Sequence, residues 1–233
     1  MRNLMRTIRR RVRALLGAGV LLTGVVGASV LAAGGTAEAA ACGSAIPAGT
    51  FCTMTGTLII TSGTLTLTPP SALGWSGTVN GLNQELVDPT AAQQSYLVDD
   101  ATGTAPGWNV TISATQFTTG GGSPSTLADG GTFSTNGSVG SMTATTAPAT
   151  ACLTGSTCTQ PTDTTTYPVG ITTTTAGTTP VTIYDTAAGT GLGSTTIGGS
   201  TSGAPVGWWL SVPSNALQGT YTSTITMELL TGP

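Results

Sequence analysis

The stretch GWNVTISATQF, residues 107 to 117, decides the fold of this chain. Its apolar residues Trp108, Val110 and Ile112 stand at every second position and alternate with polar ones. Alternation with period two, in β-branched and aromatic residues, is typical of a β-strand that buries one face. Because these three side chains would share that face, the pattern favours a strand with Trp108 in the core. A ring left open for ligand contact is the alternative.

The same alternation recurs along the chain, in stretches separated by segments rich in Gly, Thr and Pro. No stretch beyond the N-terminal region shows an apolar period of 3.6. The sequence predicts an all-β fold, a single antiparallel β-sandwich-like domain of roughly eight to ten strands with long Thr/Gly-rich loops. A disordered stalk is the alternative, but it would not need the regularly placed aliphatic residues. The other alternating stretches are GTLIITSGTLTLTP, PVTIYD, GWWLSVP and GTYTSTITMELL.

The N-terminal region predicts a signal peptide over residues 1 to 41. All 6 Lys and Arg residues are arginines that precede an apolar run beginning at Ala14, and the small residues of AEAAAC follow it. A charged start, an apolar stretch and a small-residue site are the marks of a secretory leader, with cleavage expected after Ala39 or Ala41. An uncleaved membrane anchor is the alternative. The remaining β domain would span residues 42 to 233.

All charged side chains of that domain are acidic. Of the 9 Asp and Glu residues, Glu38 lies in the leader, so eight remain against no Lys, Arg or His. Side-chain salt bridges are therefore impossible, and stability must come from apolar burial, backbone ladders and cross-links. Binding to phosphate backbones or to anionic lipid needs cations, so we expect neither nucleic acid nor anionic-lipid binding by the mature chain.

The 4 cysteines predict disulfides, since thiols of exported proteins normally oxidise. Three pairings are possible. We favour the local one, Cys42 with Cys52 and Cys152 with Cys158, because each pair brackets a loop-like stretch. The second pair would pin a loop or insertion around residues 143 to 170.

Catalytic and metal chemistry have few candidates. Without His or Lys, the common nucleophile and base arrangements are absent, so we expect no enzyme and no cofactor. Asp99 and Asp100 are adjacent and would face opposite sides of a strand. They lack a calcium-loop signature, and the cysteines lack the partners of a zinc site, so we expect no metal.

Aromatic rings on an uncharged polar surface suit contact with carbohydrate. Trp208 and Trp209 are consecutive, so on a strand their rings point to opposite sides. If one is buried, the sequence predicts that the other is exposed as a stacking contact.

Two blocks resemble the signatures of the WxL-domain surface proteins of Gram-positive bacteria. They are VDDATGTAPGWNVTISATQF, from Val98, and SVPSNALQGTYTSTITMELLTGP, from Ser211. The first motif falls on Trp108, Asn109 and Val110. The second falls on Met227, Glu228 and Leu229, where Met stands in place of the family's Trp.

The resemblance implies a secreted protein that attaches non-covalently to peptidoglycan at the cell wall or cell surface. Both motifs, with Trp208 and Trp209, are then the candidate ligand-binding residues. The alternative is a structural surface-layer, fibre or adhesin subunit, which associates with copies of itself or with other surface proteins.

Overall fold

The computed structural model describes residues 42 to 177, 179 to 199 and 203 to 233. The expected signal peptide lies outside the described residues. The chain divides into two compact units, Met1–Leu58 and Ile59–Pro233. In the described part of the first unit, a disulfide joins Cys42 to Cys52, whose Cα atoms are 5.3 Å apart. Within that loop, the amide of Thr50 donates to the carbonyl of Pro47 at 3.1 Å.

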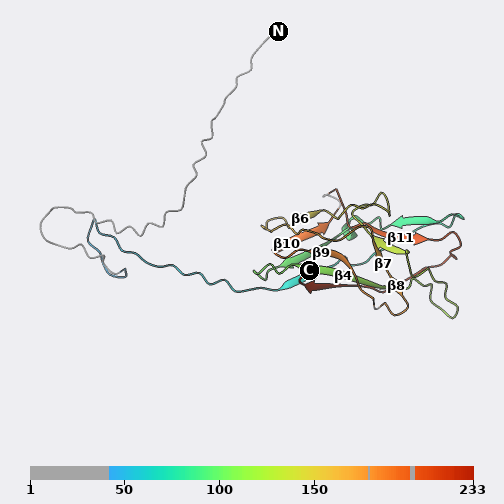
Figure 1. The fold of residues 1–233 in the computed structure, drawn as a ribbon, viewed down its shortest axis with the longest axis horizontal. Coiled ribbons are helices and arrows are strands. Elements are labelled where there is room, and N and C mark those ends of the chain that lie inside the picture. The colour runs from blue at the N-terminus through green and yellow to red at the C-terminus, as the bar shows by residue number, and fades with distance from the viewer. Residues whose placement is uncertain (1–41, 178, 200–202) are drawn as a thin grey trace, which may run out of the picture. The chain divides into compact units, whose positions relative to one another are not determined.

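The second unit is built from short β-strands (Figure 1). Its one 3-10 turn among the described residues is η1, Ala91–Gln93. The strands are β1 (Leu65–Thr68), β2 (Gln84–Val87), β3 (Ser95–Asp100), β4 (Trp108–Thr115), β5 (Phe133–Thr135), β6 (Thr150–Cys152), β7 (Val169–Ile171), β8 (Thr173–Thr174), β9 (Val181–Thr186), β10 (Gly193–Gly198), β11 (Trp208–Val212) and β12 (Ile225–Thr231).

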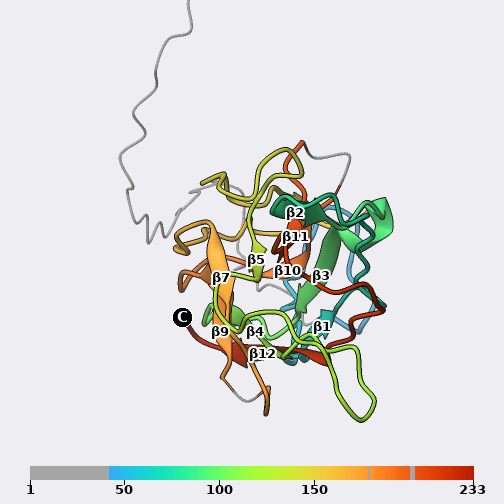
Figure 2. The same ribbon diagram turned by 90° about the vertical axis from the view of Figure 1, so that its right-hand side faces the viewer.

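These strands form three sheets around a common core. The first has the order β1-β3-β10-β6, the second β2-β11-β5-β7, and the third has β12-β4-β8 with β9 also on β4. Figure 2 shows β2 and β11 at the top of this unit, and β4 and β12 at the bottom. The predicted all-β fold is confirmed. One short pair, β4 with β8, is parallel, and the other pairs are antiparallel.

Strand β4 is the centre of the third sheet. Trp108, Val110 and Ile112 are fully buried, as their alternation predicted. Thr111 and Ser113, on the opposite face, are buried as well, and β12 and β9 flank the strand at its two edges. The strand therefore contributes one face to the hydrophobic core.

The stretch around residues 143 to 170, expected as a loop, also contributes strands. It contains β6, which pairs with β10, and it leads into β7. The disulfide between Cys152 and Cys158, with Cα atoms 5.5 Å apart, starts at the end of β6. Both local cysteine pairs thus fit the expected pairing.

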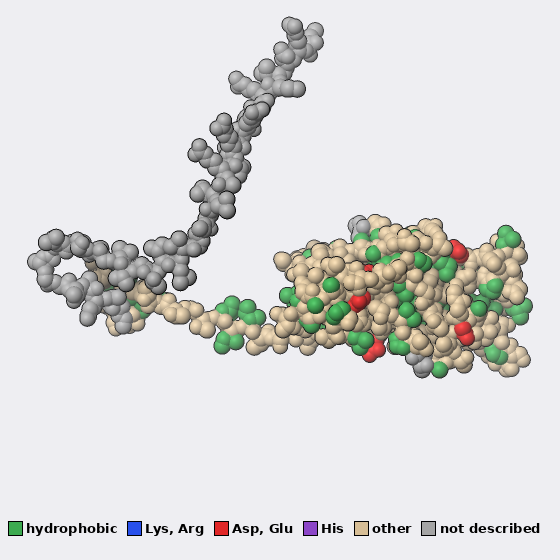
Figure 3. All heavy atoms as spheres, in the orientation of Figure 1, with side chains coloured by type: hydrophobic (Ala, Val, Ile, Leu, Met, Phe, Trp, Pro, Cys, Tyr) green, Lys and Arg blue, Asp and Glu red, His purple; other side chains and the backbone are tan. Residues whose placement is uncertain are grey.

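The surface of the described residues carries acidic groups and no basic ones. On the face drawn in Figure 3, a few red carboxylates stand apart in a field of neutral atoms. No helix in the described ranges has the length and apolarity needed to cross a membrane.

Candidate functional site

The two WxL-like motifs lie on neighbouring strands. In the ladder between β4 and β12, Val110 pairs with Leu229 and Ile112 pairs with Met227. The side-chain amide of Asn109 donates to the carbonyl of Gly232 at 2.8 Å, which fastens the end of the ladder. Motifs more than a hundred residues apart in sequence therefore form one structural feature.

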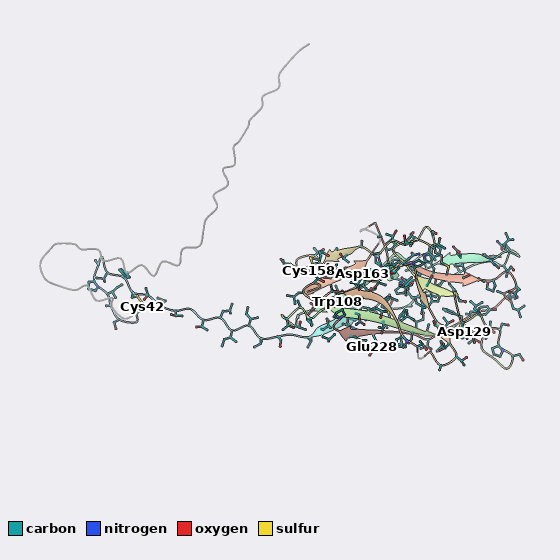
Figure 4. All side chains as sticks on the ribbon, in the orientation of Figure 1. Cys42, Trp108, Asp129, Cys158, Asp163 and Glu228 are labelled. Atoms are coloured by element: carbon teal, nitrogen blue, oxygen red, sulfur yellow. A yellow bond between two sulfur atoms is a disulfide. The ribbon has the colours of Figure 1, made fainter. Side chains whose placement is uncertain are left out.

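The ring of Trp108 is part of the core. Its exposed fraction is 0%, and its indole Nε1 donates to the carbonyl of Gly191 at 3.1 Å. The ring stacks on Tyr184 with centroids 5.5 Å apart. Gly191 has a φ of +76°, and a Cβ there would lie 2.6 Å from the indole nitrogen, so only glycine fits. Trp108, labelled in Figure 4, thus has no open ring face to offer a ligand.

A buried cluster of three tyrosines lies behind Trp108. The hydroxyl of Tyr167 donates to Asp163 Oδ2 and is also 2.8 Å from the carbonyl of Ile183. Burial, with a smaller effect from the charge of Asp163, raises the pKa of Tyr96, Tyr167 and Tyr184 above the ordinary value. These hydroxyls are therefore neutral at physiological pH.

The expected exposed ring on β11 is not there. Trp208 and Trp209 point to opposite faces, as alternation requires, but both are buried, with exposed fractions of 0% and 5%. The indole of Trp208 donates to the carbonyl of Gln93 at 2.9 Å, and that of Trp209 to the carbonyl of Ser138 at 2.9 Å. The prediction of one exposed stacking ring is wrong, because the segment after β5 covers the second face of the sheet.

That covering segment is fixed by Asn136. Its side-chain amide donates to the carbonyls of Ser141 and Met142, both at 2.9 Å. Its Oδ1 accepts from the amide of Ser138 at 2.9 Å and from the indole of Trp209 at 3.2 Å. One fully buried side chain thus folds the segment over the Trp209 ring.

The adjacent carboxylates of β3 serve structural roles. Asp100 is buried and accepts from the amide and hydroxyl of Thr102. Asp99, on the other side of the strand, accepts from the hydroxyl of Ser194 at 2.9 Å. No group of three or more acidic or cysteine side chains gathers as metal ligands in the described part of the chain.

A cleft of about 640 Å³ opens between residues 73 to 79 and residues 216 to 223. Its apolar floor comes from β2 and β11, through Leu86 and Leu210, and from Phe117. One wall is held by the buried Asp88, whose Oδ2 accepts from the amide of Gly74 at 2.8 Å. The cleft is therefore a formed feature of the fold.

Besides the buried Phe117, two half-buried rings line this cleft. Trp75 is half-buried, and its indole donates to the carbonyl of Trp208 at 3.0 Å. It meets Phe117 and Phe133 edge to face, with centroids 5.8 and 5.6 Å apart. Tyr221, also half-buried, donates its hydroxyl to the carbonyl of Leu217 at 2.9 Å. Both rings are positioned by their partners and remain partly open.

The polar groups in the cleft are all neutral. The side-chain amide of Gln84 donates to the carbonyl of Thr78 at 3.0 Å, which joins β2 to the cleft wall. A pocket with apolar rings and a few placed neutral hydrogen-bonding groups suits a neutral polar ligand such as a sugar. The polar side chains that line it are Ser76, Thr78, Gln84, Gln218, Thr220, Thr222 and Ser223.

Sequence reasoning did not identify this cleft. Its residues come from several separate stretches that only the folded chain brings together. The one local signal was Trp75, an aromatic residue between Gly74 and Gly77 and outside any alternating run. A ring in such a loop is positioned by tertiary contacts, which the sequence does not show.

Comparison with protein-family models identifies the class of protein. The model of the WxL domain, described as surface cell wall-binding, matches residues 76 to 233. The match spans both motif strands and most of the cleft, and this chain belongs to the WxL domain family. Neither the search of curated proteins nor that of solved structures found a match.

Proposed function

We propose that the protein is exported and attaches non-covalently to peptidoglycan, with the cleft beside Trp75 and Tyr221 as the contact surface. The observation that carries this proposal is the cleft's lining of two half-open rings and neutral side chains. The family is a surface cell wall-binding one, which supports a location on the wall. The role is binding, without catalysis.

The cleft is a better contact surface than the two motifs. Trp108 and Val110 are fully buried, and Met227 and Leu229 pack against the core. Their residues build the sheet that supports the domain. A sugar ring could reach Tyr221 and the amide of Gln84 without unfolding any strand.

The first test is sedimentation of the protein with isolated peptidoglycan sacculi. We expect Gln84→Ala to weaken binding roughly two- to tenfold, the effect of one neutral hydrogen bond. Gln160→Ala is the matched control, because Gln160 is exposed and lies outside the cleft. Equal binding by both variants and the wild type would remove Gln84 from the site.

Tyr221 separates ring stacking from apolar bulk. Tyr221→Leu keeps an apolar side chain in the cleft wall but loses the flat ring and the hydroxyl bond to Leu217. We expect this variant to fold and to lose wall binding. If it binds normally while Tyr221→Ala does not, the ring acts through volume and stacking is excluded.

Salt gives an independent test. The described residues have no cation, so attraction to anionic wall polymers cannot hold the protein on the wall. Added NaCl should leave binding unchanged or strengthen it, by screening the repulsion of the carboxylates. Release of bound protein by moderate NaCl would contradict the mechanism.

A structural surface subunit is the second candidate function. The observation that favours it is a run of three exposed aliphatic side chains, Leu58, Ile59 and Ile60.

A further inference from the structure

Residues 56 to 61, called the donor segment below, have the composition of a buried strand, but their aliphatic side chains are exposed. The exposed fractions of Leu58, Ile59 and Ile60 are 82%, 81% and 84%. Three consecutive aliphatic residues, two of them β-branched, are typical of a strand covered on both faces. Among the described residues, this segment pairs with no strand.

Strand β12 offers the complementary feature. It is seven residues long and pairs with β4 on one side, and within the described residues no strand pairs with its other side. Its ladder to β4 runs from Ile225 to Thr231 with no bulge. Ile225, Met227 and Leu229 face the core but remain half-buried. This is a long, regular and partly apolar sheet edge.

Such an edge normally carries protection against strand addition. Proteins protect edges with Lys, Pro, bulges or very short strands. β12 has none of these, and its one charged residue is Glu228. Strand β1 lies near β12 without a ladder between them, so the edge has no hydrogen-bonded partner in the described part of the chain. The main-chain groups of an added strand would complete the ladder.

Within the described residues, the donor segment pairs with no strand of its own chain, the edge of β12 included. Gly63 donates its amide to the carbonyl of Ala101 at 2.8 Å, and the amide of Ala101 donates to Thr64 at 3.1 Å. These bonds extend the line of β1, and only Ser62 separates them from the donor segment. The tightest common hairpin needs two loop residues, so the segment cannot fold back onto β1 itself.

We propose that the donor segment of one copy adds as a strand to the open edge of β12 in a second copy. Donor and acceptor are different segments of the chain, so the contact is head to tail, and repetition yields rings or filaments. The proposal deepens the structural candidate and rests on it. It requires no wall, which keeps its test apart from that of wall attachment.

The test measures the mass of the protein, purified after export from a secretion host, by light scattering over a range of concentrations. We expect concentration-dependent oligomers for the wild type. Replacing Leu58, Ile59 and Ile60 together with Ser should give a monomer with unchanged melting temperature, because these side chains are exposed. Leu82→Ser, at another exposed leucine outside the cleft, is the matched control and should leave the oligomers intact.

A second variant blocks the acceptor. Thr226→Lys with Leu230→Lys places charges on the exposed side of β12, and should also give a monomer. The decisive experiment mixes the donor-blocked and acceptor-blocked proteins. Each retains one intact half, so the mixture should form a 1:1 dimer and nothing larger. A monomeric wild type, oligomers that survive the Ser substitutions, or a mixture that stays monomeric would overturn the proposal.

Peptidoglycan sedimentation of the same variants separates the two functions. The donor-blocked monomer keeps the cleft, gains no charge and should still bind sacculi. Loss of oligomers with retained wall binding supports both proposals. Intact oligomers that fail to bind sacculi would reject wall attachment alone.

Discussion

Removing the Trp108 side chain tests whether the family's first motif is structural. In Trp108→Ala, the stack on Tyr184 and the hydrogen bond to Gly191 are both lost, and a large cavity remains in the core. Truncation of a buried Trp costs about 3–5 kcal/mol. That is a large part of the roughly 5–15 kcal/mol that stabilises a domain. For a domain of this size, the melting temperature should fall by about 6–20 °C.

The conservative variant Trp108→Phe separates the contribution of the ring from that of the indole hydrogen bond. Phe keeps a ring against Tyr184 but has no N–H for the carbonyl of Gly191, which is left buried without its donor. An unsatisfied buried group costs about 1–3 kcal/mol, so this variant should melt between the wild type and Trp108→Ala. Circular dichroism over a temperature ramp measures all three.

Wall binding supplies the result that would refute the reasoning. Below the melting temperature of each variant, both should bind sacculi as the wild type does, because Trp108 is fully buried and the cleft is intact. If Trp108→Ala melts with the wild type and fails to bind sacculi, Trp108 is a ligand contact. The ring of Trp108 would then have to become exposed when the protein binds the wall.

Three further outcomes follow from the structure. Trp209→Ala should lower the melting temperature, because the ring is buried and bonded to Ser138; an unchanged temperature would restore the exposed-ring prediction. Opening the Cys152–Cys158 disulfide by Cys158→Ser should cost roughly 2–3 kcal/mol in urea unfolding, the chain-entropy value for so short a loop. Alkaline pH should unfold the protein: the raised tyrosine pKa values mean that stability is full below the ordinary value of 10.0 and is lost above it, when the unfolded chain ionises first. Tyr167→Phe should reduce that loss in melts from pH 9 to 12, unless the cluster is uninvolved.

Alternation predicted β1, β4, β9, β11 and β12, because burial of one face leaves its mark on every second residue. It wrongly extended the first of these strands over residues 56 to 63, and it missed most of the shorter strands. It placed Trp108, Val110 and Ile112 on one buried face, and it put Trp208 and Trp209 on opposite sides of β11. It gave no information on what covers each face. The segment fixed by Asn136, which buries Trp209, is a tertiary contact without a local pattern.

The candidate site was less accessible from the sequence. The two motifs marked the strands that meet, β4 and β12, and their register brings Val110 opposite Leu229. The cleft, however, depends on the approach of residues 73 to 79 to residues 216 to 223. Contacts between segments so far apart leave no periodic pattern in the sequence. The role of Trp75 could therefore be seen only in the folded chain.

The pairing of β4 with β12 also sets when this protein can fold. A nascent chain that has reached Thr115 holds the central strand of the third sheet, but the neighbour that closes one edge comes only with residues 225 to 231. The long loop between the two strands must close before their hydrogen bonds can form. The entropy cost of that closure slows folding. A chain that lacks β12 leaves β4 without one of its two antiparallel neighbours, and we expect it to fold poorly.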